Sequence, residues 1–462
     1  MNSLADNLAD NLADKSHEEL VVLIQEQAQT IAFLLRKIEA LEQEIARLKG
    51  QLPPPSKVKP EPPAWVKPNQ PAPTKKPRKQ RKDAFVRKRE TPTQEIVYAC
   101  SHCPDCGRRL AGGSEYSRHQ VIDLPPLTVS ILDHVVVSRY CGVCHKSCTP
   151  HVDLTEQAVG KSRFGLGIHS LVAYLRSVAR LPIRSIGALL SAFCRLPISA
   201  GEIVLLLASV ARLGKSTYHG LQESLRTSPF VHADETGWRE NGQNGYLWSF
   251  STPSLSYFTY PKTRSGQVVT EVLGEAYKGV VVSDFYSGYR RHLGFHQRCW
   301  VHLLRDVHEL VKKYPIEGVQ NWAKRLRELY DRAKGFQSES ASARELACFS
   351  FAEEVVAFAR PYVDAGLPQS TLCQRLVSYA AELFVFVWQP DVPSENNAAE
   401  RSLRPRVIAR KISGGTRSAA GSETMAILSS LFATWRLQKL ESLAACRQML
   451  VDAQKKPGLT TA

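Results

Sequence analysis

The stretch Val231-His232-Ala233-Asp234-Glu235-Thr236-Gly237-Trp238-Arg239 decides the fold of the central part of this chain. A short apolar run reaches a carboxylate at Asp234, and a turn-forming Gly and an Arg follow it. A second apolar run ends at Asp284, and the stretch 394–401 has the pattern of a helix start that carries Glu400. Strands that end in acidic side chains place them at one edge of a sheet, and a helix can bring a third carboxylate to the same place. We therefore expect Asp234, Asp284 and Glu400 to converge on divalent metal.

The residues after Asp234 predict an α/β arrangement. Aromatic-rich strands are expected at 246–250 and 257–260, then a helix at 267–273, the strand ending at Asp284, and a strand from His296 that leads into a helix. The order of three strands, helix, strand, strand and helix fits a mixed sheet flanked by helices. This layout resembles the ribonuclease H-like fold. We assign it to residues 226–440, with a helical insertion at about 311–385, and expect a C-terminal tail at 441–462.

Length and charge limit what such a site acts on. The 462 residues suffice for two to four domains, and the formal net charge of +16 suits a polyanionic partner such as nucleic acid, although acidic membranes attract the same surfaces. No apolar run approaches the roughly 20 residues of a membrane helix, and the N-terminus does not resemble a secretion signal. We expect a cytoplasmic protein with no membrane contact, whose eleven cysteines are reduced or metal-bound.

Residues 18–49 predict a helix with a narrow apolar seam. Isoleucines recur every seven residues, and leucines follow three positions after the last three of them: Ile24, Ile31, Ile38 and Ile45, with Leu34, Leu41 and Leu48. Ile at a and Leu at d favour a parallel two-stranded coiled coil, and Gln27 at the remaining d position would help to fix its register. This predicts a homodimer or higher oligomer. The alternative is an amphipathic helix that packs against its own protein.

The composition changes between residues 50 and 94. Three consecutive prolines at 53–55 open a stretch that cannot hold helix or sheet, and nine Lys or Arg residues crowd between 75 and 89. We interpret this segment as a basic linker that neutralises phosphates. A solvated linker without a partner explains the composition equally well.

Residues 95–152 contain two CxxC knuckles. They are formed by Cys103 and Cys106 and by Cys141 and Cys144, with apolar, β-branched sequence at 129–137 between them that predicts a small hairpin. Four thiolates around zinc would stabilise a segment too small to build its own core. A redox pair or buried cysteines are the alternatives. Four neighbours are possible substitute ligands: Cys100, His102, His145 and Cys148.

Residues 160–225 predict an all-helical domain. Apolar helices at 186–190 and 203–207 are separated by Leu196-Pro197-Ile198-Ser199, and Ser199 is a natural N-cap for the second helix. Two helices with a tight turn fit a DNA-binding helix-turn-helix. An ordinary helical hairpin that packs against the neighbouring domain fits the pattern at least as well, because the second helix offers few side chains suited to reading bases.

Four motifs resemble the signatures of the insertion sequence 66 family of DDE transposases. They are Asp-Glu-Thr-Gly-Trp at 234–238, Ser-Asp-Phe-Tyr-Ser-Gly-Tyr at 283–289, Arg-Cys-Trp-Val-His-Leu-Leu-Arg-Asp at 298–306 and Glu-Asn-Asn-Ala-Ala-Glu-Arg-Ser-Leu-Arg-Pro at 395–405. The similarity spans nearly the whole chain, because members of the family also carry a coiled coil, a zinc module and a helical segment. The resemblance implies that Asp234, Asp284 and Glu400 are the catalytic triad. Glu395 stands where the family usually has Asp and is a second candidate ligand.

Phosphodiester chemistry supports the same three acids. Two divalent ions about 4 Å apart activate water and stabilise the leaving oxygen when carboxylates hold them. Asp234 would bridge the ions, and Asp284 and Glu400 would each complete one coordination sphere. Hard oxygen ligands favour Mg²⁺ or Mn²⁺.

Four further residues are expected to support the acids. Asn396 lies one turn before Glu400 and would orient a carboxylate or a metal-bound water, and Arg401 opens a basic run that would grip phosphates. His302 and Arg305 would approach the scissile phosphate. A solvated basic face and a packed helix surface, respectively, are the alternatives.

The resemblance implies a DNA transposase that frees a 3′-hydroxyl at each transposon end and joins it to target DNA, with accessory proteins as possible partners. A ribonuclease H-like nuclease or resolvase would share the site without strand transfer. A non-catalytic DNA-binding regulator would share the coiled coil, the zinc module and the basic linker.

Overall fold

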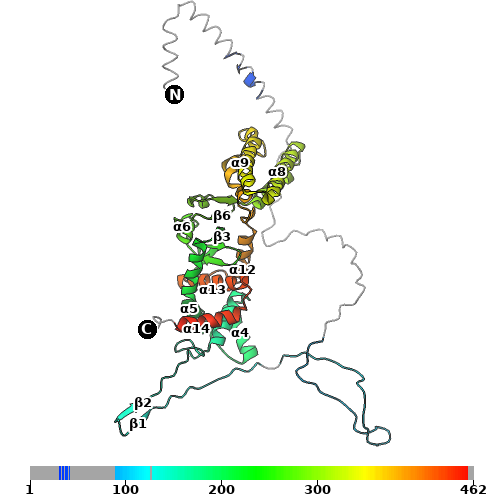
Figure 1. Cartoon of the computed structure of the whole chain (residues 1–462), viewed down its shortest axis with the longest axis vertical. Coiled ribbons are helices and arrows are strands. Elements are labelled where there is room, and N and C mark those ends of the chain that lie inside the picture. The colour runs from blue at the N-terminus through cyan, green and yellow to red at the C-terminus, as the bar shows by residue number, and fades with distance from the viewer. Residues whose placement is uncertain are drawn as a thin grey trace, which may run out of the picture. The chain divides into compact units, whose positions relative to one another are not determined.

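The computed structural model describes residues 31, 32, 34, 35, 37–39, 41, 89–124 and 127–455 of the chain. These residues form two compact units (Figure 1). One contains Leu303–Gly335 and Glu353–Ser378 together with the described residues before position 70, and the other contains the described parts of Gln70–His302, Phe336–Ala352 and Tyr379–Ala462. The larger unit holds the sheet and the acidic residues, so it is described first.

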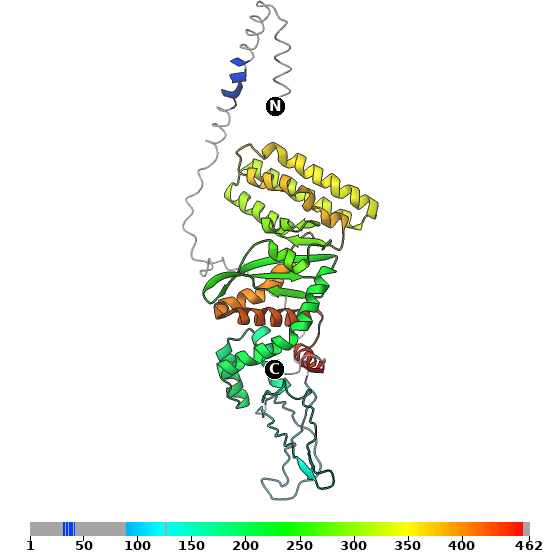
Figure 2. The same ribbon diagram turned by 90° about the vertical axis from the view of Figure 1, so that its left-hand side faces the viewer.

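A five-stranded mixed sheet is the centre of the larger unit (Figure 2). Its strands in chain order are β3 (Phe230–Glu240), β4 (Gln243–Ser251), β5 (Ser256–Thr259), β6 (Val280–Ser283) and β7 (His296–Arg298). The spatial order is β5-β4-β3-β6-β7. β3, β4 and β5 are antiparallel neighbours, whereas β6 is parallel to β3 and β7 is parallel to β6. With α6 (Gln267–Leu273) before β6, the 3-10 turn η1 (Ser287–Arg291) before β7 and α7 (Trp300–Lys313) after it, the predicted order of elements is confirmed.

β3 is longer than its apolar run suggests. We expected a turn at Gly237, but β3 pairs with β4 along its whole length, and the turn lies at Asn241-Gly242, where both residues have positive φ. A two-residue loop of this kind matches the right-handed twist of a hairpin. Pairing between β3 and β6 ends at His232 and Val282. Asp234 is therefore inside a strand, but just beyond the end of the neighbouring one.

Helices cover both faces of the sheet. On one face, α12 (Asn397–Ser413) packs Leu403 against Trp238, Leu247 and Phe258, and α13 (Ala419–Leu437) lies on the same side (Figure 2). On the other face, Trp248 and neighbouring β3 and β4 residues pack against α6 in a core that also includes α5 (Ala200–Arg226). The sheet is therefore a buried middle layer, which is why its central strands are apolar on both sides.

The helical segment before the sheet shares this core. α3 (Leu166–Ser177) and α4 (Ile183–Cys194) precede α5, and Ser199 forms a capping box with Glu202 at the start of α5. The predicted helices and N-cap are thus confirmed. α5 is 27 residues long and packs against α3, α13 and β5. Packing against the sheet domain is the geometry of a helical hairpin, and a DNA-reading role for this segment stays a prediction.

The C-terminal residues are not a tail, contrary to our expectation. α14 (Ser442–Lys455) is a helix whose Cys446, Met449 and Leu450 are buried in the same core as α3 and α5. Apolar residues at helical spacing bury one stripe of a helix, and this stripe was overlooked.

The predicted insertion is helical. In the smaller unit α8 (Glu317–Gly335), part of α9 (Ala341–Ala359) and α10 (Ser370–Ser378) pack around Trp322, which stacks on Phe358 with ring centroids 5.8 Å apart. The remaining short elements are η2 (Phe336–Ser338), η3 (Arg360–Tyr362), η4 (Ala380–Glu382) and α11 (Val385–Trp388).

Before position 160 the chain contains little regular structure among its described residues. β1 (Arg139–Cys141) and β2 (Lys146–Cys148) form a hairpin around the second CxxC knuckle. The hairpin expected at 129–137 is not formed, and Val135 and Val137 are exposed with no strand facing them. The described residues between 31 and 41 are helical, and Ile31, Leu34, Ile38 and Leu41 are all at least 50% exposed. The rest of the predicted coiled coil and residues 50–88 of the predicted linker lie outside the described residues. Across the part of the chain that is described, no helix is long and apolar enough to cross a membrane.

Candidate active site

Asp234 and Asp284 lie on adjacent parallel strands. The β3–β6 register pairs His232 with Val282, so two residues further along each chain Asp234 and Asp284 occupy corresponding positions. Asp234 pairs with Ser249 of β4, whose hydroxyl donates to Ser402 of α12 at 3.1 Å. Because side chains alternate along a strand, Asp234 is directed toward the face that α12 covers. The parallel sheet therefore brings together two acids that are 50 positions apart.

Glu400 comes from the first turn of α12, where a carboxylate is favoured by the helix dipole. Its Oε1 lies 3.4 Å from Nε2 of His302, which is near the start of α7. Both side chains are partly exposed. The structure thus brings the predicted residues Glu400 and His302 together.

Asn396 fixes the start of α12 to β3. Its buried side-chain amide donates to the carbonyl of Ala233 at 2.7 Å and accepts from Nδ1 of His232 at 2.9 Å. Its backbone N–H donates to Sγ of Cys299 at 3.1 Å. Burial lowers the pKa of His232, so the ring is neutral and Nδ1 carries the proton that Asn396 accepts. We expected Asn396 to orient a carboxylate or a metal-bound water. Its side-chain contacts are instead with the His232 ring and the Ala233 carbonyl, which fix the start of the helix that carries Glu400.

Arg298 holds the backbone in place at Asp284, as Asn396 does beside Asp234. This guanidinium is fully buried, donates to the Asp284 carbonyl at 2.8 Å and to the Ser283 hydroxyl at 3.0 Å, and forms an ion pair with Glu382. Asp284 Oδ1 in turn accepts from the N–H of Tyr286 at 2.9 Å. Arg298 belongs to one of the quoted motifs, but its contacts were not predicted, because its ion-pair partner Glu382 is 84 residues away in the chain.

The carboxylates repel one another. The pKa of Asp234 is raised to about 8, first by burial and then by the charges of Glu235, Asp284 and Glu400, while the Glu235 N–H that donates to Asp234 Oδ1 opposes this shift. The acids that raise the pKa of Asp234 most are Glu235, Asp284 and Glu400, whereas Glu395 raises the pKa of His232. The electrostatic neighbour of Asp234 on α12 is therefore Glu400.

Glu235 is a fourth acid that the sequence analysis did not single out. It alternates with Asp234 and lies on the opposite face, where it accepts from Arg264 at 2.7 Å and from the hydroxyl of Tyr289. Burial raises the pKa of Glu235, and these two hydrogen bonds oppose the shift. Strand alternation next to Asp234 was the signal that would have found it.

Arg401 and Arg305 are the other two predicted residues. Arg401 is exposed and lines a separate pocket with Ser251 and Thr252. Arg305 is exposed on α7 in the smaller unit, three residues beyond His302. Among the described residues no three His, Cys, Asp or Glu side chains lie close enough together to hold one ion. The donor set at the sheet edge nevertheless fits a cation, because it offers hard carboxylate oxygens whose mutual repulsion a divalent ion would relieve.

Each CxxC knuckle forms a tight local turn. Gly107 has positive φ and donates to the carbonyl of Cys103 at 2.9 Å, and the Cys144 N–H donates to Sγ of Cys141 at 3.5 Å. Backbone N–H groups of Cys106 and Asp105 lower the pKa of the Cys103 thiol. Backbone N–H groups of Cys144 and Val143 do the same for the pKa of the Cys141 thiol. Lowered thiol pKa values favour the thiolates that zinc requires. The two knuckles are not brought together in the described residues.

Comparison with known proteins agrees with the geometry. A stretch of 147 residues is 30% identical to the uncharacterized protein y4jO of Sinorhizobium fredii (strain NBRC 101917 / NGR234). This stretch makes up 31% of the present chain and 43% of that protein. The chain thus spans less than half the length of this relative. The family model described as Transposase IS66 family matches residues 161–424. That match covers more than half of the chain and includes Asp234, Asp284 and Glu400, and on this basis the chain belongs to the IS66 transposase family.

Proposed function

We propose that this chain is a DNA transposase that cleaves transposon ends and transfers the freed 3′-hydroxyl into target DNA at a carboxylate-held metal site. The observation that carries the proposal is that Asp234 and Asp284 occupy corresponding positions on adjacent parallel strands, and that the charges of Asp284 and of Glu400, in the first turn of α12, help to raise the pKa of Asp234 to about 8. Acids that repel one another inside a protein are costly unless a cation binds them. The family match supplies the transposase role.

The sheet supports this proposal. The order β5-β4-β3-β6-β7, with three antiparallel strands followed by two parallel ones, is that expected of a ribonuclease H-like domain. Asp234, Asp284 and Glu400 would hold Mg²⁺ or Mn²⁺. When bound, the ions would supply Lewis-acid activation of the attacking water and neutralise the leaving oxygen. His302, at 3.4 Å from Glu400, would hold that carboxylate in place.

A strand-transfer assay tests the proposal. The full chain would be incubated with a labelled duplex from the end of its encoding element, a target plasmid and magnesium. The parent should give joined products, and Asp284→Ala should give none while still binding the duplex. Nicked duplex without joined products would instead indicate a nuclease or resolvase, and binding without nicking would indicate a regulator.

We also propose that the two CxxC knuckles hold one zinc ion through Cys103, Cys106, Cys141 and Cys144. The thiol pKa values lowered by the knuckle turns support this assignment. Zinc measured by elemental mass spectrometry should be near one ion per chain and should be lost from Cys103→Ser/Cys141→Ser. An unchanged zinc content in that variant would reject these ligands.

A further inference from the structure

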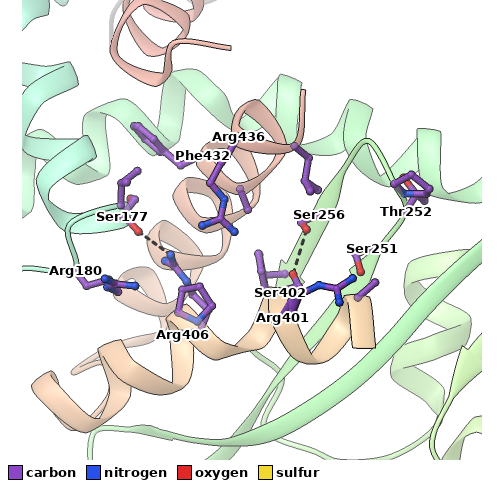
Figure 3. Close-up of a pocket in the computed structure, with 17 residues that line it drawn as sticks. Ser177, Arg180, Ser251, Thr252, Ser256, Arg401, Ser402, Arg406, Phe432 and Arg436 are labelled. Atoms are coloured by element: carbon purple, nitrogen blue, oxygen red, sulfur yellow. Dashed lines mark hydrogen bonds between the residues drawn. The ribbon is translucent and has the colours of Figure 1, made fainter. Parts of the chain in front are cut away.

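A pocket of about 300 Å³ lies where α12, α13, the β4–β5 turn and the end of α3 meet (Figure 3). None of the acids described above lines it. On α12, Ala398, Arg401, Ser402, Pro405 and Arg406 line this pocket. At 100° per residue these positions centre on the side of the helix opposite Glu400. The pocket and the acidic site therefore lie on opposite faces of one helix.

Four arginines from three parts of the chain line the pocket. They are Arg180 just after α3, Arg401 and Arg406 on α12, and Arg436 on α13 (Figure 3). No Asp or Glu is among the described residues that line it. Clusters of guanidinium groups without a carboxylate are uncommon inside proteins, because each buried charge needs a partner. The pocket therefore carries a positive charge that its own residues do not neutralise.

Arg406 is the buried member of the set. It is 5% exposed, and its two terminal nitrogens donate to neutral acceptors, the Ser429 hydroxyl at 2.9 Å and the Ser177 carbonyl at 2.6 Å. Burial lowers the pKa of Arg406, and the Tyr260 phenol opposes this shift. The charges of neighbouring arginines lower the pKa of Arg406 further, and these are Arg176, Arg180 and Arg436. An anion bound in the pocket would offset the repulsion between Arg406 and the neighbouring arginines.

Hydroxyl groups complete the lining. The side-chain oxygens of Ser177 and Ser251 are buried without a hydrogen-bond partner in the structure, and both residues line the pocket. Hydroxyls and guanidinium groups are the usual donors to phosphate oxygens. A volume of about 300 Å³ is at the small end of ligand sites, which suits a phosphate with its adjoining sugar.

We propose that this pocket binds one backbone phosphate of the DNA strand whose cleavage is assigned to the acidic site. This inference rests on the proposed function. A helix with its side chains is about 10–12 Å across, and one strand advances about 3.4 Å per nucleotide. The bound phosphate is then about three nucleotides from the bond at the acidic site. Arg406 is the floor of the site, and Arg180, Arg401 and Arg436 close around the phosphate.

The test measures binding and needs no chemistry. The probe is a fluorescein-labelled duplex from the end of the encoding element, titrated with the full chain in EDTA at several salt concentrations. Arg180→Gln/Arg436→Gln removes two arginines that are not buried, so the fold should persist, whereas Arg406 is too buried for a safe substitution. Arg212→Gln/Arg447→Gln is the matched control, because it removes two exposed arginines that do not line the pocket.

The pocket variant should bind about tenfold more weakly than the control, and the slope of log affinity against log salt should fall by about one. Equal affinities and slopes for the two double variants would overturn the proposal. Protection of the parent by inorganic phosphate against thermal unfolding, lost in the pocket variant but without any difference in DNA binding, would also overturn it, since the ligand would then be free phosphate. If the parent binds DNA but gives no strand transfer, the proposed function fails. The binding measurements on the pocket variant and its control would still test whether the pocket binds phosphate.

Discussion

The two faces of α12 carry opposite charges. On one face the charge of Glu400 adds to those of Glu235 and Asp284, and the pKa of Asp234 is raised to about 8. On the other face Arg401 and Arg406 meet arginines from α3 and α13, and the pKa of Arg406 is lowered. In each case burial is the largest cause and like charges add to it. Excess charge of one sign in a buried place favours a ligand of the other sign, so the helix would separate the proposed cation site from the proposed anion site.

Glu235 is a buried acid next to Asp234 whose charge is balanced by partners within the protein. It is next to Asp234 in sequence and is nearly as buried, yet it has a guanidinium partner in Arg264 and a hydroxyl donor in Tyr289. This ion pair satisfies Glu235 within the protein, which leaves little reason to assign it a ligand. The comparison between the two faces can therefore be tested by removing charges one at a time.

The largest effect is expected from exchanging the acids of α12. Glu400→Gln should lower strand transfer by two to three orders of magnitude or more, because it removes a charged ligand from the acidic site. Glu395→Gln should change the rate only a few-fold, since Glu400 is among the acids that raise the pKa of Asp234 most, whereas Glu395 raises the pKa of His232. Initial rates in magnesium measure both. The reverse ranking would move the third ligand to Glu395 and remove Glu400 from the comparison.

A smaller loss of strand-transfer activity is expected when the hydrogen bonds that fix the start of α12 are removed. Asn396→Ala removes the hydrogen bonds to His232 and to the Ala233 carbonyl, and residues that hold metal ligands in place are typically worth 10- to 100-fold in activity. It should also lower the free energy of unfolding by about 1–3 kcal/mol, because buried polar groups lose their partners. Urea unfolding and magnesium titration of the rate measure the two effects. Unchanged magnesium dependence with lower stability would make Asn396 purely structural.

The elements that carry the acids could be predicted from the sequence because they follow local rules. Apolar runs that reach Asp234 and Asp284 are short-range signals, and the strand, helix and N-cap at Ser199 were found in the same way. The mixed sheet with flanking helices also followed from the order of elements along the chain, whereas the spatial order of its strands did not. The predicted turn at Gly237 was wrong, because pairing with β4 continues through that residue. The predicted tail was also wrong, because the apolar stripe of α14 was overlooked.

The arginine pocket could not have been predicted in this way. Its lining joins Arg180, Arg401 and Arg436, which are up to 256 positions apart, and only the packing of α3, α12 and α13 brings them together. The sequence shows a basic run after Glu400 but not that Arg406 is buried while Arg401 is exposed. Arg298 was missed for the same reason, because its ion pair with Glu382 depends on tertiary structure.

The smallest effect is expected on thermal stability without divalent metal. The pKa of Asp234 is raised above its ordinary value of 3.8 to about 8, so the folded chain holds this proton more tightly than the unfolded chain. Its contribution to stability is therefore complete below about pH 4 and is lost as the pH rises to about 8, by at most about 1.4 kcal/mol for each pKa unit. In EDTA the melting temperature of the parent should fall from pH 6 to pH 8.5 more than that of Asp234→Asn, which cannot ionise. Magnesium should raise the melting temperature of the parent by several degrees at pH 8.5 and that of the variant by little, because only the parent presents a charge for the ion to offset.

The exposed residue Asp133 offers the control Asp133→Asn, which should follow the parent. Curves that stay parallel for the parent and Asp234→Asn would show that the acidic face is neutralised without metal, and the contrast between the two faces of α12 would then fail.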